Sequence, residues 1–216
     1  MKINTDGVLL AAMVTSKAPK QILDIGTGTG VIALMLAQRF PLAQVEAVEI
    51  DEQASVTAKK NFQLSVFNDR LSINNIAIEQ YNRSERFDLI VSNPPFFVND
   101  LKNAEEKKGI ARHTDELFFD ELIAKVSSLL SEDGQFWFIL PIKQAEILVK
   151  KGKTHGLFEQ QLIQLHSDQS KPAFRRIVSL GKKKMDVLSG HFYIYQAEKV
   201  YTTAYQELLK DFFLGY

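Results

Sequence analysis

The tetrapeptide Asn93-Pro94-Pro95-Phe96 constrains the fold of this chain more than any other stretch. It directly follows Phe87–Ser92, an apolar run typical of a buried strand in a parallel sheet. A proline has no backbone N–H, so two consecutive prolines cannot continue a central strand and the chain must leave the sheet here. Open α/β sheets bind ligands at the carboxyl ends of their strands. The sequence therefore predicts a binding loop at this point.

The groups in this loop suit a planar substrate with an amino group. The residue before a proline is pushed into extended geometry, which fixes the direction of Asn93. Its amide oxygen and the proline carbonyls can accept hydrogen bonds from an amino group, and Phe96 offers a flat face. We interpret Asn93, Pro94, Pro95 and Phe96 as candidate catalytic residues. A purely structural loop is an equally good explanation of the two prolines taken alone.

Composition limits what else the chain can be. With 216 residues and 45% hydrophobic content, we expect a single domain over residues 1–216. Lys and Arg (26) balance Asp and Glu (26), so contacts to nucleic acid must come from a local patch. The chain has no cysteine, and its four histidines lack metal-type spacing, so no metal is expected. No apolar run approaches the ~20 residues of a membrane span and no signal peptide is evident. We expect a soluble, cytoplasmic protein.

The order of elements predicts the fold class. Strands are expected at 21–25, 44–50, 70–75, 87–92 and 135–140, separated by helices at 31–40, 52–64 and 115–130. This alternation predicts an α/β, doubly wound, mostly parallel sheet. Asp6 is expected to cap a first helix over 7–16, and Asp133-Gly134 to form a turn. A helix at 142–151, strands at 158–165, 176–180 and 191–196, and a helix at 202–213 complete the chain, the late strands forming an antiparallel addition at one edge.

One connection is unusually long. Residues 99–112 are polar and rich in Lys and Glu, which fits a lid or binding segment. A solvated helix fits equally well, because Lys102 and Glu106 have i,i+4 spacing.

Between the first strand and the second helix lies a glycine run from Gly26 to Gly30. Such glycines allow a sharp turn and close approach of a ligand to the start of the helix. A dinucleotide fingerprint starting at Gly26 fails because Val31 stands where glycine is needed, whereas the variant starting at Gly28 and ending in Ala33 fits. The glycines alone therefore do not separate a nicotinamide enzyme from another nucleoside-binding protein.

Two acidic residues flank the glycine run. Glu49, at the end of the second strand, can accept hydrogen bonds from both hydroxyls of a ribose. Asp24 adds negative charge, which repels a pyrophosphate and attracts a cation. No Lys follows Gly30, unlike in a phosphate-binding P-loop. This pattern indicates S-adenosylmethionine, whose sulfonium is positive and whose adenosine carries a ribose.

These motifs together resemble those of class I S-adenosylmethionine-dependent methyltransferases. Asp24 to Gly30 matches the D-x-G-x-G-x-G cofactor loop, Glu49 the ribose-binding acid, and Asn93 to Phe96 the N-P-P-[YF] motif of amino-group methylases. More narrowly, the chain is similar over essentially its whole length to the bacterial tRNA1(Val) adenine-N6 methyltransferases. That similarity rests on Thr5-Asp6-Gly7, Arg112-His113, residues 134–141 and residues 205–213.

The resemblance implies a Rossmann-like sheet of seven strands with the last-but-one antiparallel, and a tRNA substrate methylated at the adenosine 3′ of the anticodon. The residues it assigns to the cofactor are Asp24, Gly26, Thr27, Gly28, Gly30, Glu49, Ile50, Asn75, Ala77 and Asn93. Phe96, Arg112 and His113 are assigned to the anticodon stem–loop. Lys171 and Arg175 are added from the residues themselves, because they lie in a basic–aromatic stretch that suits RNA binding, although such a stretch is more often a solvated surface.

The chain departs from the family pattern in two places. It begins almost at Thr5-Asp6-Gly7, where relatives carry an upstream segment, so a truncated sequence or a shorter N-terminus is expected. Ala77 stands where an Asp often binds the cofactor adenine, and Asn75 or a backbone N–H can serve instead. His113 fits a structural role as well as a binding one.

Three other functions are compatible with the same motifs. The Asn-Pro-Pro sequence also occurs in protein-glutamine N5-methyltransferases, but these normally carry an added N-terminal helical domain. Guanine-N2 methylation of ribosomal RNA is a second possibility. The third is a non-catalytic module that binds RNA or cofactor, which the intact Asn93, Glu49 and glycine loop disfavour.

Overall fold

The computed structural model of the chain describes residues 5–95 and 106–212, with the backbone alone for 106–116. The helices are α1 (Thr5–Met13), α2 (Val31–Arg39), α3 (Glu52–Leu64), α4 (Glu106–Leu129), α5 (Ile142–Thr154) and α6 (Thr203–Leu209), with short 3-10 helices η1 (Asn68–Arg70) and η2 (Ile78–Gln80). The strands are β1 (Gln21–Ile25), β2 (Gln44–Glu49), β3 (Leu71–Asn75), β4 (Phe87–Ser92), β5 (Leu130–Leu140), β6 (Phe158–His166), β7 (Ala173–Gly181), β8 (Leu188–Tyr193), β9 (Tyr195–Ala197) and β10 (Val200–Tyr201).

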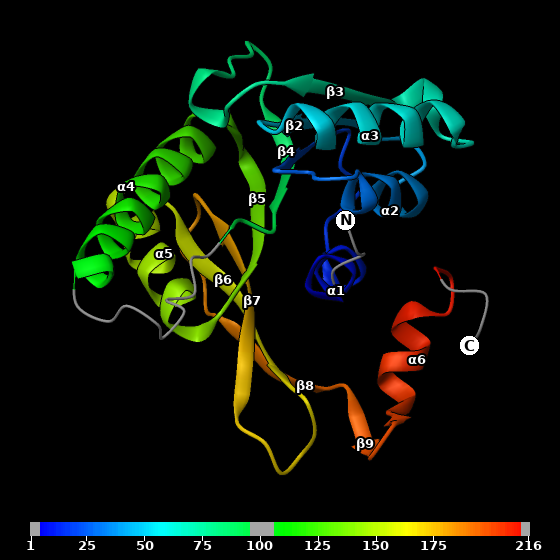
Figure 1. Cartoon of the computed structure of the whole chain (residues 1–216), viewed down its shortest axis with the longest axis vertical. Helices are drawn as coiled ribbons and strands as arrows, with labels where there is room; N and C mark the ends of the chain where they lie inside the picture. Colours follow the sequence, from blue (N-terminus) through cyan, green and yellow to red (C-terminus); the bar gives the residue numbers. More distant parts are fainter. Residues whose placement is uncertain (1–4, 96–105, 213–216) are drawn as a thin grey trace.

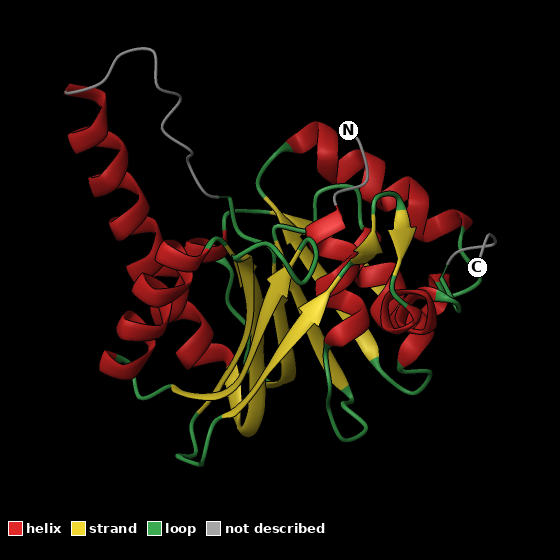
Figure 2. Ribbon diagram, turned by 90° about the horizontal axis from the view of Figure 1, so that it is seen from below, coloured by secondary structure: helices red, strands yellow, loops and turns green. Residues whose placement is uncertain are grey.

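A single sheet with helices on both faces forms the centre of the molecule (Figure 1, Figure 2). Its strand order is β3-β2-β1-β4-β5-β7-β6-β8, and β9 and β10 form a separate hairpin. The strands from β3 to β5 are parallel to one another, as their helical crossovers require. The α/β, doubly wound, mostly parallel fold expected from the sequence is confirmed.

The far side of the sheet differs from expectation in detail. β7 is antiparallel to both β5 and β6, so the antiparallel strand lies between them, as the family resemblance implies, and not at the edge of the sheet, as the order of elements predicts. β8 then pairs in parallel with β6, which makes eight strands in the described sheet instead of seven. The expected strand at 191–196 is two strands, β8 and β9, because the chain leaves the sheet at Ile194.

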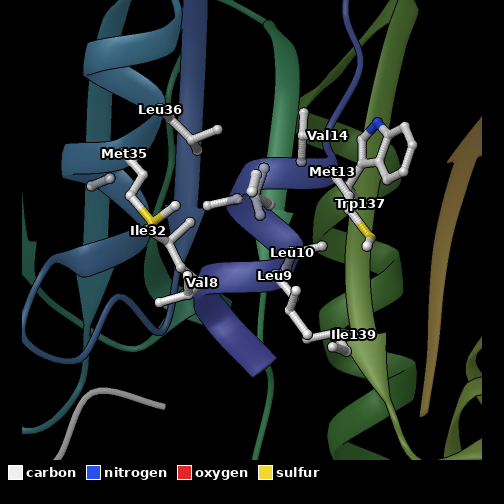
Figure 3. Close-up of a cluster of buried hydrophobic side chains, with 14 of the residues drawn as sticks. Val8, Leu9, Leu10, Met13, Val14, Ile32, Met35, Leu36, Trp137 and Ile139 are labelled. Atoms are coloured by element: carbon white, nitrogen blue, oxygen red, sulfur yellow. The ribbon is translucent and has the colours of Figure 1, made fainter. Parts of the chain in front are cut away.

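The helices divide into two layers with separate apolar cores. One core joins α1, α2, α3 and α6 to one face of the sheet, and the other joins α4 and α5 to the opposite face. The first helix is enclosed on all sides, because residues 8–14 are all buried. Figure 3 shows α1 wedged between α2 and β5, with Ile32 and Met35 on one side and Trp137 and Ile139 on the other. This packing fixes the amino-terminal end of α1 beside the carboxyl ends of the strands.

Three local expectations are corrected by the structure. Asp6 lies within the first turn of α1, and its carboxylate contacts Arg175 Nε at 2.8 Å instead of capping the helix. Asp133 and Gly134 lie inside β5, at a break in its pairing with β4. Phe87 pairs with Leu130 and Leu89 pairs with Gln135, so β5 has extra residues between these two pairs. α4 begins at Glu106, so the helical alternative holds from there.

Candidate functional site

The glycine loop connects β1 to α2 and depends on backbone conformations that favour glycine. Gly26, Gly28 and Gly30 have φ angles of +70°, +59° and +89°. A Cβ atom on Gly30 would lie 2.5 Å from Phe62 Cε1, so α3 leaves no room for a side chain there. The backbone N–H groups of Gly26 and Thr27 both donate to the Val48 carbonyl, at 2.9 and 3.2 Å. The loop is therefore tied to the end of β2.

Asp24 lies beneath this loop and holds it to α2. Its Oδ2 accepts hydrogen bonds from Thr27 Oγ1 at 2.5 Å and from the Ala33 N–H at 3.1 Å. The side chain is fully buried, and this burial raises its pKa to about 7. Asp24 does not line the cavity described below, so the structure places it under the cofactor loop and not on its surface. Its Oδ1 has no hydrogen-bond partner among the described residues.

Glu49 ends β2 and faces the loop from the other side. Its Oε2 accepts from the Gly28 N–H at 2.7 Å, and its Oε1 accepts from the Asp51 N–H at 2.9 Å. A carboxylate has about four acceptor positions, so two are left for a ligand. The side chain is only 9% exposed and lines the cavity. Glu49 is thus held in place by the backbone while it still faces the cavity.

The loop after β4 forms the opposite wall. Ser92, the last residue of β4, donates its hydroxyl to the Ile25 carbonyl at 2.9 Å, which joins β4 to the end of β1. Asn93 is half-buried, Pro94 buried and Pro95 exposed. A Cβ on Gly7 would lie 3.8 Å from Asn93 Nδ2 and 3.3 Å from Ile32 Cδ1. The start of α1 therefore packs closely against the Asn93 amide.

These elements enclose one cavity of about 490 Å³ at the carboxyl ends of β1, β2 and β4. Most of the residues predicted to bind cofactor or substrate amine line it together: Gly26, Thr27, Gly28, Glu49, Ile50, Ala77, Asn93, Pro94 and Pro95. Asp24, Gly30 and Asn75 are not in the lining. The Asn75 amide instead donates to the carbonyls of Glu49 and Ile50, at 2.8 and 3.2 Å, and so fixes the turn that carries Glu49.

Several lining residues were not identified from the sequence. Gly7 and Ile32 contribute from α1 and α2, Glu79 from η2, and Phe118 from α4. Ile76 and Ile78 line the cavity on either side of Ala77, so the wall at this position is apolar. The part of the Thr5-Asp6-Gly7 motif that lines the cavity is its glycine, and a side chain there would press on Ile32.

The cavity fits S-adenosylmethionine in three respects. The glycine loop lines the cavity through Gly26 and Gly28, both at positive φ and without a side chain between their backbone and a ligand. Glu49 has acceptor positions free for a ribose. The lining is otherwise mainly apolar, which suits an adenine ring and a thioether chain, and its only carboxylates among the described residues are Glu49 and Glu79. A phosphate would meet these acids without a compensating cation in that lining.

The predicted RNA-binding residues are not gathered in one place. Arg175, at the start of β7, is linked to the cavity through Asp6, the neighbour of Gly7. Lys171 is in the turn between β6 and β7. Arg112 and His113 belong to α4, but their side chains are outside the described part, as is the whole of Phe96.

Within the described ranges 5–95 and 106–212, no helix is long and apolar enough to cross a membrane. No group of three or more potential metal ligands is found in that same part of the chain.

The architecture and the cavity define a class I, Rossmann-like methyltransferase. A predicted O-methyltransferase from Agrobacterium tumefaciens superposes with a TM-score of 0.73 at 18% identity, covering 95% of this chain and 96% of the other. A methyltransferase from Pyrococcus furiosus superposes with a TM-score of 0.60 at 23% identity, covering 82% of this chain and 81% of the other. At these identities the likeness establishes the fold.

Sequence comparison is more specific. The family model "Methyltransferase small domain" matches residues 2–151. A tRNA1(Val) (adenine(37)-N6)-methyltransferase from Pedobacter heparinus is 55% identical over the full chain and 92% of its own length. A protein of the same name from Trichodesmium erythraeum is 40% identical, again over the full chain and 92% of its own length. The chain belongs to the methyltransferase small domain family, and within it to the family of these tRNA1(Val) (adenine(37)-N6)-methyltransferases.

Proposed function

We propose that this chain transfers a methyl group from S-adenosylmethionine to the exocyclic N6 of an adenine in tRNA, at the adenosine 3′ of the anticodon of tRNA1(Val). The observation that carries this function is that Asn93, Pro94 and Glu49 line the same cavity as the glycine loop. The family relatives carry the corresponding activity in their names. A tRNA substrate also agrees with a cytoplasmic location.

The cofactor half of the site is assigned by its contacts. Glu49 binds the ribose hydroxyls, and the glycine loop passes along the cofactor with its backbone. The adenine ring packs on the wall of Ile50 and Ala77. Asp24 and Asn75 act indirectly, because the first holds the loop to α2 and the second holds the turn at Glu49. When bound, S-adenosylmethionine supplies an electrophilic methyl group on a positively charged sulfur.

Asn93 and Pro94 make the adenine amino group reactive. The lone pair of N6 is delocalised into the ring, which makes this nitrogen a poor nucleophile. Hydrogen bonds from N6 to the Asn93 side-chain oxygen and the Pro94 carbonyl favour a more tetrahedral nitrogen, whose lone pair is available. With the amino group held by Asn93 and Pro94, N6 would bond to the methyl carbon while the carbon–sulfur bond would break and leave its electron pair on sulfur. The extra proton on N6 then passes to water.

Binding by the loop also orients the substrate base. Phe96 stacks on an adenine that has left its own loop, as in other enzymes that modify a flipped-out base. Arg112, His113, Lys171 and Arg175 contact the flanking RNA backbone. Holding the nitrogen in line with the methyl group lowers the barrier by several kcal/mol in comparable systems.

Methyl transfer from labelled cofactor tests this function directly. The purified protein is incubated with bulk tRNA lacking the modification, with ribosomes, and with release factor, and the label in each is counted. We expect label in tRNA alone, and nuclease digestion with mass spectrometry should locate N6-methyladenosine next to the anticodon. Label in release factor or in ribosomal RNA would favour the glutamine or guanine reaction, and no label anywhere would favour a non-catalytic module.

A further inference from the structure

Three rings gather at the carboxyl ends of β6 and β8, outside the catalytic cavity. His166 contacts His191 and Tyr193, with ring centroids 5.1 and 4.8 Å apart, and His191 and Tyr193 are stacked at 11° between planes. His191 is exposed and the other two are half-buried. We call His166, His191 and Tyr193 the ring cluster. Nothing in the proposed mechanism uses it.

The hydrogen bonds of the cluster hold both imidazoles in fixed orientations. His166 Nδ1 lies 2.9 Å from the Lys171 carbonyl, which can only accept, so Nδ1 carries the proton. His166 Nε2 and His191 Nδ1 lie 2.8 Å apart and share a second hydrogen bond. This distance leaves no space for a metal ion between the two nitrogens. The result is a chain of two donated hydrogen bonds that ends in an outward-facing His191 ring.

The ring cluster and the catalytic loop lie at the same end of the strands, with β5 and β7 between them. Ser92 is level with Phe138, Phe138 with Val178, and Val178 with Leu162 in the strand register. His166 lies four residues beyond Leu162, which places it ~13 Å further out along the strand direction than Ser92. Three strand spacings separate β4 from β6, or ~14 Å sideways. The β6–β7 hairpin extends well beyond the rest of the sheet (Figure 1).

Charge around the cluster is nearly balanced. Arg175 is paired with Asp6 and Arg176 with Glu146, and Lys171 shares its turn with Asp168. Lys171 and Arg175 can still contact phosphates of the flanking RNA, but net charge does not explain the rings themselves. The features that remain are flat rings in fixed orientations and the exposed Phe174 ring, both of which suit a base more than a phosphate.

We propose that the ring cluster is a stacking platform for an unpaired RNA base, one of the nucleotides that flank the target adenine in the same loop. This inference rests on the proposed function, because it takes RNA as the substrate. Base–aromatic stacking tolerates any base, so the platform positions the loop without reading its sequence. The hydrogen-bonded imidazoles lose little freedom on binding, because their orientation is set in advance.

Ring-retaining and ring-removing variants separate stacking from a structural role. We expect Tyr193→Leu and His191→Leu to weaken binding of an anticodon stem–loop RNA by roughly 5- to 150-fold each, and Tyr193→Phe to leave it within about 2-fold. His191→Phe keeps a ring but loses the bond to His166, so it should bind better than His191→Leu. His155→Leu, between α5 and the amino-terminal end of β6, is the matched control. Affinity is measured by fluorescence anisotropy, and cofactor binding checks that each variant is folded.

Abasic substitutions identify the stacked nucleotide. Each loop nucleotide other than the target is made abasic in turn, and affinity is measured with the natural protein and with His191→Leu. We expect one or two positions at which base removal weakens binding to the natural protein but not to the variant. Additive losses at every position would overturn the platform. If the Leu and Phe variants at Tyr193 and His191 bind RNA equally well while the natural protein methylates the RNA, the stacking proposal is wrong and the proposed function stands. If the natural protein neither binds nor methylates RNA, both are wrong.

Discussion

The two sides of the site are built in different ways. On the cofactor side, backbone groups hold the polar side chains: Glu49 accepts from Gly28 and Asp51, and Asp24 accepts from Ala33. On the β6–β8 side, the candidate contacts are made by side chains on exposed hairpin and edge-strand positions, such as Lys171, Phe174 and His191.

This difference has a physical cause. A small, invariant cofactor gains most from donors and acceptors that are already in place, since no ordering cost is then paid on binding. An RNA loop is larger and more flexible, so it can be bound by several separate contacts at the carboxyl ends of the strands, each of which contributes part of the binding free energy. We therefore expect single substitutions on the cofactor side to change cofactor affinity or turnover, and those on the β6–β8 side to change RNA affinity while cofactor affinity stays the same.

The largest effect is expected at the junction of the two sides. Asn93→Ala removes the acceptor that we assign to the transition state, and should lower kcat by about 100- to 1,000-fold. Cofactor affinity should change by no more than about 3-fold, because the glycine loop and Glu49 are untouched. Single-turnover methylation and cofactor titration measure the two quantities. Unchanged turnover would remove Asn93 from the mechanism.

Asp24 gives a pH dependence with a definite sign. Burial raises its pKa from 3.8 to about 7, so between these values the folded protein binds a proton that the unfolded chain has released. Its contribution to stability is therefore present below about pH 4 and is lost as pH rises through 7. Between pH 5 and 8 the loss should be on the order of 2–3 kcal/mol.

Asp24→Asn stays neutral and keeps an acceptor for Thr27, so its free energy of unfolding should fall less over this pH range. Urea denaturation of both proteins at pH 5 and pH 8 provides the comparison. Identical pH slopes would show that Asp24 has an ordinary pKa, and so is hydrated or paired in the folded protein.

Glu49→Gln tests the assignment of the ribose. The amide keeps the shape but loses the charge and one acceptor, so cofactor affinity should fall about 10- to 100-fold, equivalent to roughly 1.5–3 kcal/mol for charged hydrogen bonds. Glu52→Gln, one turn away at the exposed start of α3, is the control and should bind normally. Isothermal titration with the cofactor measures both, and an unaltered affinity in Glu49→Gln would contradict the assignment.

A pair of glycine variants separates backbone strain from collision. Gly30 and Gly156 both have positive φ angles, +89° and +75°, but only Gly30 has Phe62 where a Cβ would lie. Gly156→Ala should therefore cost about 1 kcal/mol, and Gly30→Ala about 1–3 kcal/mol more. Thermal unfolding of each variant measures the difference. Equal destabilisation would mean that Phe62 moves aside without cost.

The local parts of this architecture could be predicted from the sequence. The bounds of β1, α3 and β4 agree with expectation, because each is a short periodic segment between clear breakers. The glycine loop, Glu49 and Asn93 meet in one cavity because consecutive parallel strands place their carboxyl ends together.

What the sequence did not reveal depends on register and tertiary contact. The sequence predicts a turn at Gly134, yet a Cβ there would lie 2.8 Å from the Phe87 carbonyl, so the glycine is needed for a close approach between strands. The histidines look dispersed in the sequence, but the parallel pairing of β6 with β8 brings His166 and His191 into contact. The sequence suggests Asn75 as a contact to the cofactor adenine. In the folded chain its amide donates to the Glu49 carbonyl, a contact that only the tertiary structure shows.

The smallest effect, of opposite sign to that of Asp24, is expected in the β6–β7 turn. The hydrogen bond from the Ser170 hydroxyl, 2.5 Å from Asp168 Oδ1, is the main reason that the pKa of this carboxyl is lowered. Its contribution to stability is therefore present above the pKa of the unfolded chain and is lost as pH falls through the lower folded value. Ser170→Ala should raise the titration midpoint of Asp168 more than Ser167→Ala does, since Ser167 contributes less. Carbon-detected NMR titration of the carboxyl resolves the two, and equal midpoints would show that the Ser170 bond does not persist in this exposed turn.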